Sequence, residues 1–123
     1  MDKSGKILIV DDEQMVTKTL SMLLGLEGFS DVVLYNNPNE AIEYLKENEV
    51  DLIISDFIMP EMNGIETAKK IFDKLDRRIP LLFITELSDK SVIMQCLSLN
   101  VSGYIVRPYK PDFVLSEIKR VIG

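Results

Sequence analysis

Five short runs of apolar residues recur along this chain, and longer stretches with helical spacing lie between them. The runs cover residues 7–10, 32–35, 52–55, 81–85 and 104–106, and they are rich in β-branched and aromatic side chains. Each intervening stretch repeats its apolar residues at steps of three or four, as an amphipathic helix does. Strands that alternate with helices predict a parallel sheet covered by helices on both faces. We therefore expect an α/β fold.

Residues that are typical of helix starts divide the rest of the chain into five expected helices. The first is expected after Asp12, and the second is expected to begin with Asn37 as its N-cap and Pro38 in its first turn. The third is expected from residues 63–64, the fourth from Ser88 and the fifth after residues 108–111. Every strand is thus followed by a helix, which is the connection that parallel strands require.

Length and composition limit the classes of function. A chain of 123 residues with 46% hydrophobic side chains fits a single domain over residues 1–123. Its formal charge of −6 argues against direct binding of nucleic acid or of an anionic membrane surface. A lone cysteine excludes an internal disulfide and, with no apolar run of membrane-spanning length, favours the cytoplasm. The oligomeric state is left open.

Polar side chains follow four of the five strands. Asp11 and Asp12 follow the first, Asp56 follows the third, Thr85 ends the fourth and Arg107 follows the fifth. The carboxyl ends of parallel strands meet at one edge of a sheet, where such folds bind ligands. Taken singly, these residues have ordinary explanations: a helix cap, a loop acid, a strand hydroxyl and a surface charge.

Together, the three carboxylates need another explanation. Two unit charges about 4 Å apart repel by roughly 4 kcal/mol at an effective dielectric constant of about 20, a large fraction of a domain's stability. A hard divalent cation removes that cost. The chain has no histidine, and oxygen ligands alone suit Mg²⁺, Mn²⁺ or Ca²⁺ better than zinc. Because Mg²⁺ in such sites commonly bridges to phosphate, we expect phosphoryl chemistry here.

Four motifs resemble the receiver domain of bacterial two-component response regulators, including its chemotaxis-regulator-like members. They read ILIVDDE, DLIISDFIMPEMNG, FITE and GYIVRPYK, and the likeness extends over nearly the whole chain. The resemblance implies a flavodoxin-like five-stranded sheet of order 2-1-3-4-5. It also implies a phosphoacceptor signalling domain and not an enzyme, beyond catalysis of its own phosphorylation.

The resemblance also assigns roles to individual residues. Asp56 matches the phosphoacceptor, and Thr85 and Tyr104 match the switch pair. The expected Mg²⁺ ligands are Asp12 directly, Asp11 largely through water, Asp56, and the backbone carbonyl of Ile58. A partner histidine kinase or histidine phosphotransfer protein is the expected donor, and a downstream protein or output domain the expected target. A cis peptide is implied before Pro108.

Two positions depart from the family pattern. Arg107 stands where the family has lysine, and Glu86 stands where a small residue is usual. Arginine keeps the charge but is longer, planar and forked. These changes leave open an interaction module with weakened or absent phosphate switching. A small Mg²⁺-dependent phosphohydrolase is a further alternative. Lys110 lies nearby in sequence, but its place at the start of a helix makes it a poor substitute for the missing lysine.

Overall fold

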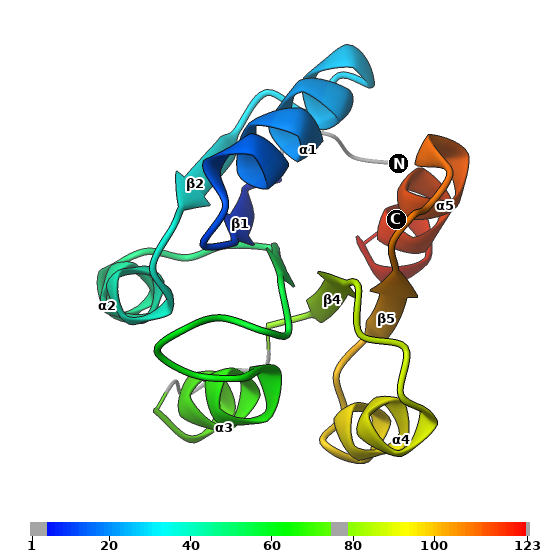
Figure 1. Ribbon diagram of the computed structural model, residues 1–123. Helices are drawn as coiled ribbons and strands as arrows, with labels where there is room; N and C mark the ends of the chain where they lie inside the picture. Colours follow the sequence, from blue (N-terminus) through cyan, green and yellow to red (C-terminus); the bar gives the residue numbers. More distant parts are fainter. Residues whose placement is uncertain (1–4, 75–78, 123) are drawn as a thin grey trace.

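The computed structural model describes residues 5–74 and 79–122, which form five strands and five helices (Figure 1). The strands are β1 (Ile7–Val10), β2 (Val32–Tyr35), β3 (Leu52–Ser55), β4 (Leu81–Thr85) and β5 (Gly103–Val106). The helices are α1 (Gln14–Leu26), α2 (Pro38–Glu47), α3 (Gly64–Lys74), α4 (Lys90–Ser98) and α5 (Pro111–Ile122). None of the described helices combines the length and apolar character needed to cross a bilayer.

All five strands pair in parallel in one sheet of order β2-β1-β3-β4-β5, which confirms the expected fold. The chain reverses its direction across the sheet between β2 and β3, because β1 lies between them. Figure 1 shows α1 and α5 on one face of the sheet and α2, α3 and α4 on the other. The carboxyl ends of β1 and β3 therefore lie next to each other at the point where the strand order reverses.

Each face of the sheet has its own hydrophobic core. Alternate residues of the central strands point to opposite faces, so Leu8 packs toward α2 and α3 while Ile9 packs toward α1 and α5. Both residues are at most 1% exposed, which explains why the strand reads as an unbroken apolar run. Cys96 of α4 is fully buried in the core that also contains Leu8.

Two expected boundaries were wrong by one or two residues. Helix α4 begins at Lys90 and not at Ser88, because the carboxylate of Asp89 accepts the backbone N–H groups of Ser91 and Val92 and caps the helix. Strand β5 begins at Gly103, one residue earlier than expected. The expected N-cap of α2 is confirmed, since the side chain of Asn37 accepts two backbone N–H groups of the first turn.

Candidate metal and phosphoryl site

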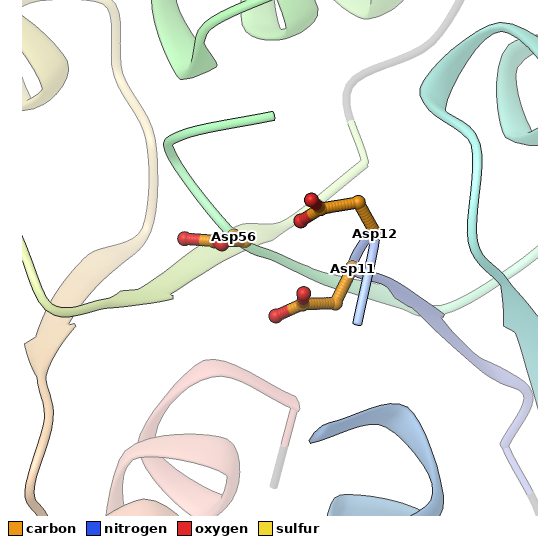
Figure 2. A group of neighbouring side chains, drawn as sticks. All are labelled: Asp11, Asp12 and Asp56. Carbon is orange, nitrogen blue, oxygen red and sulfur yellow. The ribbon is translucent and has the colours of Figure 1, made fainter. Parts of the chain in front are cut away.

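Three carboxylates meet at the carboxyl edge of the sheet, as expected. Asp11 and Asp12 follow β1 and Asp56 follows β3, and one carboxylate oxygen from each lies within 4.8 Å of the others (Figure 2). Asp11 and Asp56 are only 2% and 6% exposed, whereas Asp12 faces solvent. Asp11 and Asp56 are thus the buried members of the cluster, and solvent reaches the cluster at Asp12.

The backbone around Asp11 is fixed by three hydrogen bonds. Its N–H donates to the carbonyl of Tyr35 at 3.1 Å, its carbonyl accepts from Nδ2 of Asn36 at 2.7 Å, and its Oδ1 accepts from the N–H of Glu13 at 2.9 Å. Glu13 is the N-cap residue of α1, so neither Asp11 nor Asp12 serves as the helix cap. A helix cap, the ordinary explanation for an aspartate at this position, therefore does not account for either acid.

Burial and like charge act together on Asp11. Its pKa rises to about 7, chiefly because burial disfavours the charged form and also because Asp56 and Asp12 are negative. The N–H of Glu13 and the charge of Arg107 oppose this rise. A cation at the centre of the three carboxylates would relieve both effects. The donor set, which is hard oxygen with one side open to water, fits Mg²⁺ or Mn²⁺.

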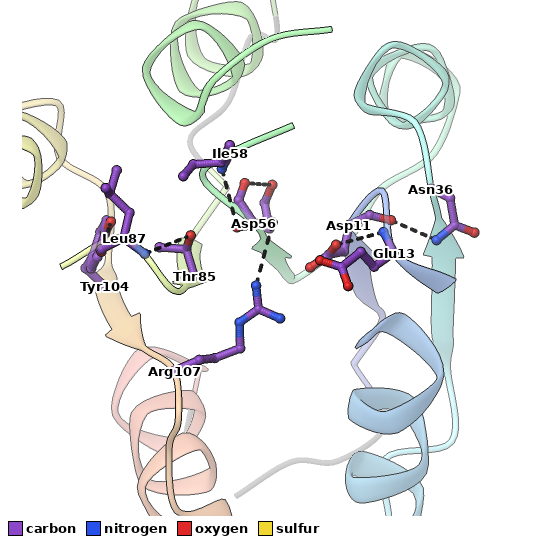
Figure 3. A network of polar contacts seen from close by, with 10 residues as sticks. Asp11, Glu13, Asn36, Asp56, Ile58, Thr85, Leu87, Tyr104 and Arg107 are labelled. Atoms are coloured by element: carbon purple, nitrogen blue, oxygen red, sulfur yellow. Dashed lines mark hydrogen bonds and ion pairs between the residues drawn. The ribbon is translucent and has the colours of Figure 1, made fainter. Parts of the chain in front are cut away.

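Among the described residues, Asp56 forms one ion pair. Its Oδ2 lies 3.7 Å from Nη2 of Arg107, whose backbone N–H donates to the carbonyl of Thr85 at 2.8 Å (Figure 3). The other oxygen, Oδ1, accepts from the N–H of Ile58 at 3.3 Å. The peptide between Arg107 and Pro108 is cis, as the resemblance implied.

The guanidinium group of Arg107 makes fewer hydrogen bonds than it can donate. The 3.7 Å gap to Asp56 is too long for a hydrogen bond, and Nε of Arg107 is buried without a partner in the described part of the chain. Glu86 is exposed and lines a groove of about 640 Å³ together with Arg107 and Tyr109. Lys110 is also exposed and makes no ion pair among the described residues, so Arg107 is the cation that faces Asp56.

The expected switch residues share one partner, Leu87. The N–H of Leu87 donates to Oγ1 of Thr85 at 3.4 Å, and its carbonyl accepts from the hydroxyl of Tyr104 at 2.6 Å (Figure 3). Thr85 is 1% exposed, and the ring of Tyr104 lies 6.2 Å from the rings of both Phe57 and Phe83. Burial raises the pKa of the Tyr104 hydroxyl to about 12, so it remains a hydrogen-bond donor at neutral pH.

Two site neighbours were not predicted from the sequence. Asn36 follows β2 and binds the carbonyl of Asp11, and the rule that polar residues gather after strand ends would have found it. Phe57 follows Asp56 and packs edge-on against Phe83, with ring centroids 5.4 Å apart. Its position after a site residue carries no comparable signal, because an apolar residue there is an ordinary core residue.

Comparison with known proteins agrees with this geometry. Residues 7–119 match the family model described as response regulator receiver domain. The chemotaxis protein CheY1 of Helicobacter pylori is 32% identical over 120 residues, which are 96% of this chain and 97% of that protein. The transcriptional regulatory protein SrrA of Staphylococcus aureus is 31% identical, and the match covers 97% of this chain but 48% of SrrA.

The fold also matches solved structures. The chemotaxis protein CheY4 of Vibrio cholerae superimposes with a TM-score of 0.86 at 27% identity, covering 96% of this chain and 98% of that one. The sheet order, the acidic edge and the family match lead to the same result. The chain belongs to the response regulator receiver domain family, the phosphoacceptor signalling domains of two-component systems.

Proposed function

We propose that Asp56 accepts a phosphoryl group from a phosphohistidine of a partner histidine kinase or phosphotransfer protein. A carboxylate oxygen of Asp56 attacks phosphorus, the bond from phosphorus to the imidazole nitrogen breaks, and the imidazole leaves with the bonding electron pair. The observation that supports this role is the carboxylate itself. It is 6% exposed, lies beside two further acids and faces Arg107.

Asp11, Asp12, Asp56 and the carbonyl of Ile58 would hold Mg²⁺, or Mn²⁺ in its place. The bound ion would supply charge neutralisation for an attack between two anions. Arg107 would add a second positive charge at the phosphoryl oxygens. Asp11, already held by the N–H of Glu13 and by Asn36, keeps the edge of the site in place during the reaction.

The signal would pass from Asp56 through Thr85 to Tyr104. A phosphoryl oxygen accepts a hydrogen bond from the Thr85 hydroxyl, which draws that side chain away from the N–H of Leu87. Tyr104 then gives up its bond to the carbonyl of Leu87 and turns inward. The surface around α4, β5 and α5 changes, and a downstream protein or output domain reads the change as a population shift.

The proposal also covers the extent of the domain, its location in the cell and its partners. The chain acts as one receiver domain over residues 1–123, works in the cytoplasm, and binds protein partners without direct contact to nucleic acid or membrane. It catalyses its own phosphorylation but no turnover of a substrate. The match to SrrA, which covers about half of that protein, is compatible with a receiver joined to an output domain. The weakened-switching and hydrolase alternatives rank below this proposal.

The test is phosphorylation with acetyl phosphate, followed by mass spectrometry. Wild-type protein with Mg²⁺ should gain one phosphoryl group, whereas Asp56→Asn, or wild-type protein in a chelator, should gain none. Asp73→Asn, which changes an exposed aspartate on α3, is the control and should behave as wild type. An adduct that persists in Asp56→Asn would disprove the assignment. Rapid release of free phosphate would favour the hydrolase.

A further inference from the structure

A second groove lies on the surface between α2 and the end of β2. Its volume is about 560 Å³, and two tyrosines, three glutamates and two asparagines line it. Figure 1 shows α2 beside β2, at the edge of the sheet opposite to β5. None of its lining residues belongs to the carboxylate site or to the switch pair. The groove therefore needs a separate explanation.

Two aromatic rings form the apolar part of the groove. The centroids of Tyr35 and Tyr44 are 5.4 Å apart with the rings tilted by 49°, and both side chains are half-buried. Nζ of Lys6 lies 5.9 Å from the ring centroid of Tyr44 and donates to its hydroxyl at 3.2 Å. The Tyr44 ring thus already attracts one ammonium group. Lys6 is not among the residues that line the groove.

Carboxylates surround these rings. Glu40, Glu43 and Glu47 follow one another on α2 at steps of three and four, so they share one face of the helix. Glu43 pairs with Lys46 at 2.7 Å, whereas Glu40 and Glu47 form no ion pair within the described residues. The wall of the groove therefore keeps an excess of negative charge around an aromatic surface.

We propose that this groove binds a basic peptide segment of a partner protein. An arginine or lysine side chain lies against Tyr35 and Tyr44, and its charge faces Glu40 and Glu47. The lining residues of α2 run from Asn39 to Glu47, which is about 12 Å along the helix axis at the usual rise. That length matches roughly four residues of extended chain, so the groove suits a peptide better than a single small cation.

The test is a titration with a capped tetra-arginine peptide, followed by residue-resolved NMR in excess Mg²⁺. Shifts are expected at Tyr35, Tyr44 and the exposed face of α2. The double variant Glu40→Gln/Glu47→Gln should bind about three- to tenfold more weakly than wild type. The charge-matched control Asp73→Asn/Asp112→Asn also removes two exposed carboxylates and should bind as wild type.

A second comparison tests the aromatic surface. Tyr35→Leu should weaken binding about threefold, while Tyr35→Phe, which keeps the ring, should bind as wild type. The proposal is overturned if a citrulline peptide binds equally well, or if the control weakens binding as much as the glutamine variant. Spermidine binding as tightly as the peptide would contradict a peptide partner. Shifts confined to Asp11, Asp12 and Asp56 would assign the binding to the carboxylate site and would overturn the proposal for the groove.

Discussion

The ion pair between Arg107 and Asp56 makes a quantitative prediction. Two unit charges 3.7 Å apart attract by about 4.5 kcal/mol at an effective dielectric constant of about 20, which is an upper limit. The pair makes no hydrogen bond, and Arg107 is 16% exposed, so the net coupling must be smaller. Removing one partner of a fully buried ion pair lowers the free energy of unfolding by about 3–5 kcal/mol. An exposed ion pair contributes at most about 1 kcal/mol. We expect a coupling of about 1–2 kcal/mol between these limits.

A double-mutant cycle measures this coupling. The free energy of unfolding of wild type, Arg107→Ala, Asp56→Asn and the double variant is obtained from urea titrations in a chelator near neutral pH. Arg107→Ala should destabilise the fold, because it leaves Asp56 buried without its cation, beside Asp12 and a partly ionised Asp11. Asp56→Asn should stabilise it, because it removes repulsion from Asp11. Excess Mg²⁺ should reduce the coupling.

The exposed pair between Arg120 and Glu117 provides the matched control. Its atoms are closer, at 2.9 Å, but Arg120 is 52% exposed, so its coupling should be only about 0.3–0.5 kcal/mol. A coupling for Arg107 and Asp56 no larger than this control would refute the reasoning. It would mean that the charge of Arg107 does not balance Asp56 in the resting protein.

Three further predictions follow from single residues. Gly64→Ala should destabilise the fold by about 1–3 kcal/mol, because its Cβ would lie 2.2 Å from a ring carbon of Phe57; Gly25→Ala, with nothing within 4 Å, should not. Burial raises the pKa of the Cys96 thiol to about 11, so iodoacetamide at pH 9 should label it far more slowly in native protein than in urea. Ile58→Asn should speed the decay of phosphorylated protein measured by mass spectrometry, because the apolar Ile58 cannot orient an attacking water; an unchanged decay would contradict this.

The fold was predictable because its signals are local. Double burial makes the central strands continuous apolar runs, and four of the five strands have the expected bounds. Gly103 was missed because it has no side chain to mark a strand, although its Cβ would lie 2.8 Å from a methyl group of Leu82. The start of α4 was missed because Ser88 and Asp89 are both capping residues. In the structure it is Asp89 that accepts the backbone N–H groups of Ser91 and Val92.

The sequence predicted which carboxylates lie together at the edge of the sheet. It did not predict the distance from Arg107 to Asp56. The end-of-strand rule places Asp11, Asp12 and Asp56 together, and the structure brings their oxygens within 4.8 Å. The 3.7 Å gap from Arg107 to Asp56 depends on a long side chain with several rotatable bonds. No pattern of residue types specifies that rotamer, or the burial of its Nε atom without a partner.

Thr85 and Tyr104, the proposed switch residues, both bond to Leu87, and this shared partner would let two side chains from different strands move together. Thr85 holds the N–H of Leu87 and Tyr104 holds its carbonyl, so both bonds depend on the position of one peptide segment. A well-formed hydrogen bond is worth about 0.5–1.5 kcal/mol net, and the 3.4 Å bond to Thr85 is the weaker of these two. On the proposed function, drawing Thr85 toward a phosphoryl group removes one of the two bonds that fix Leu87. The segment is then fixed only by the bond from the Tyr104 hydroxyl, so less free energy is needed for Tyr104 to give up that bond and turn inward.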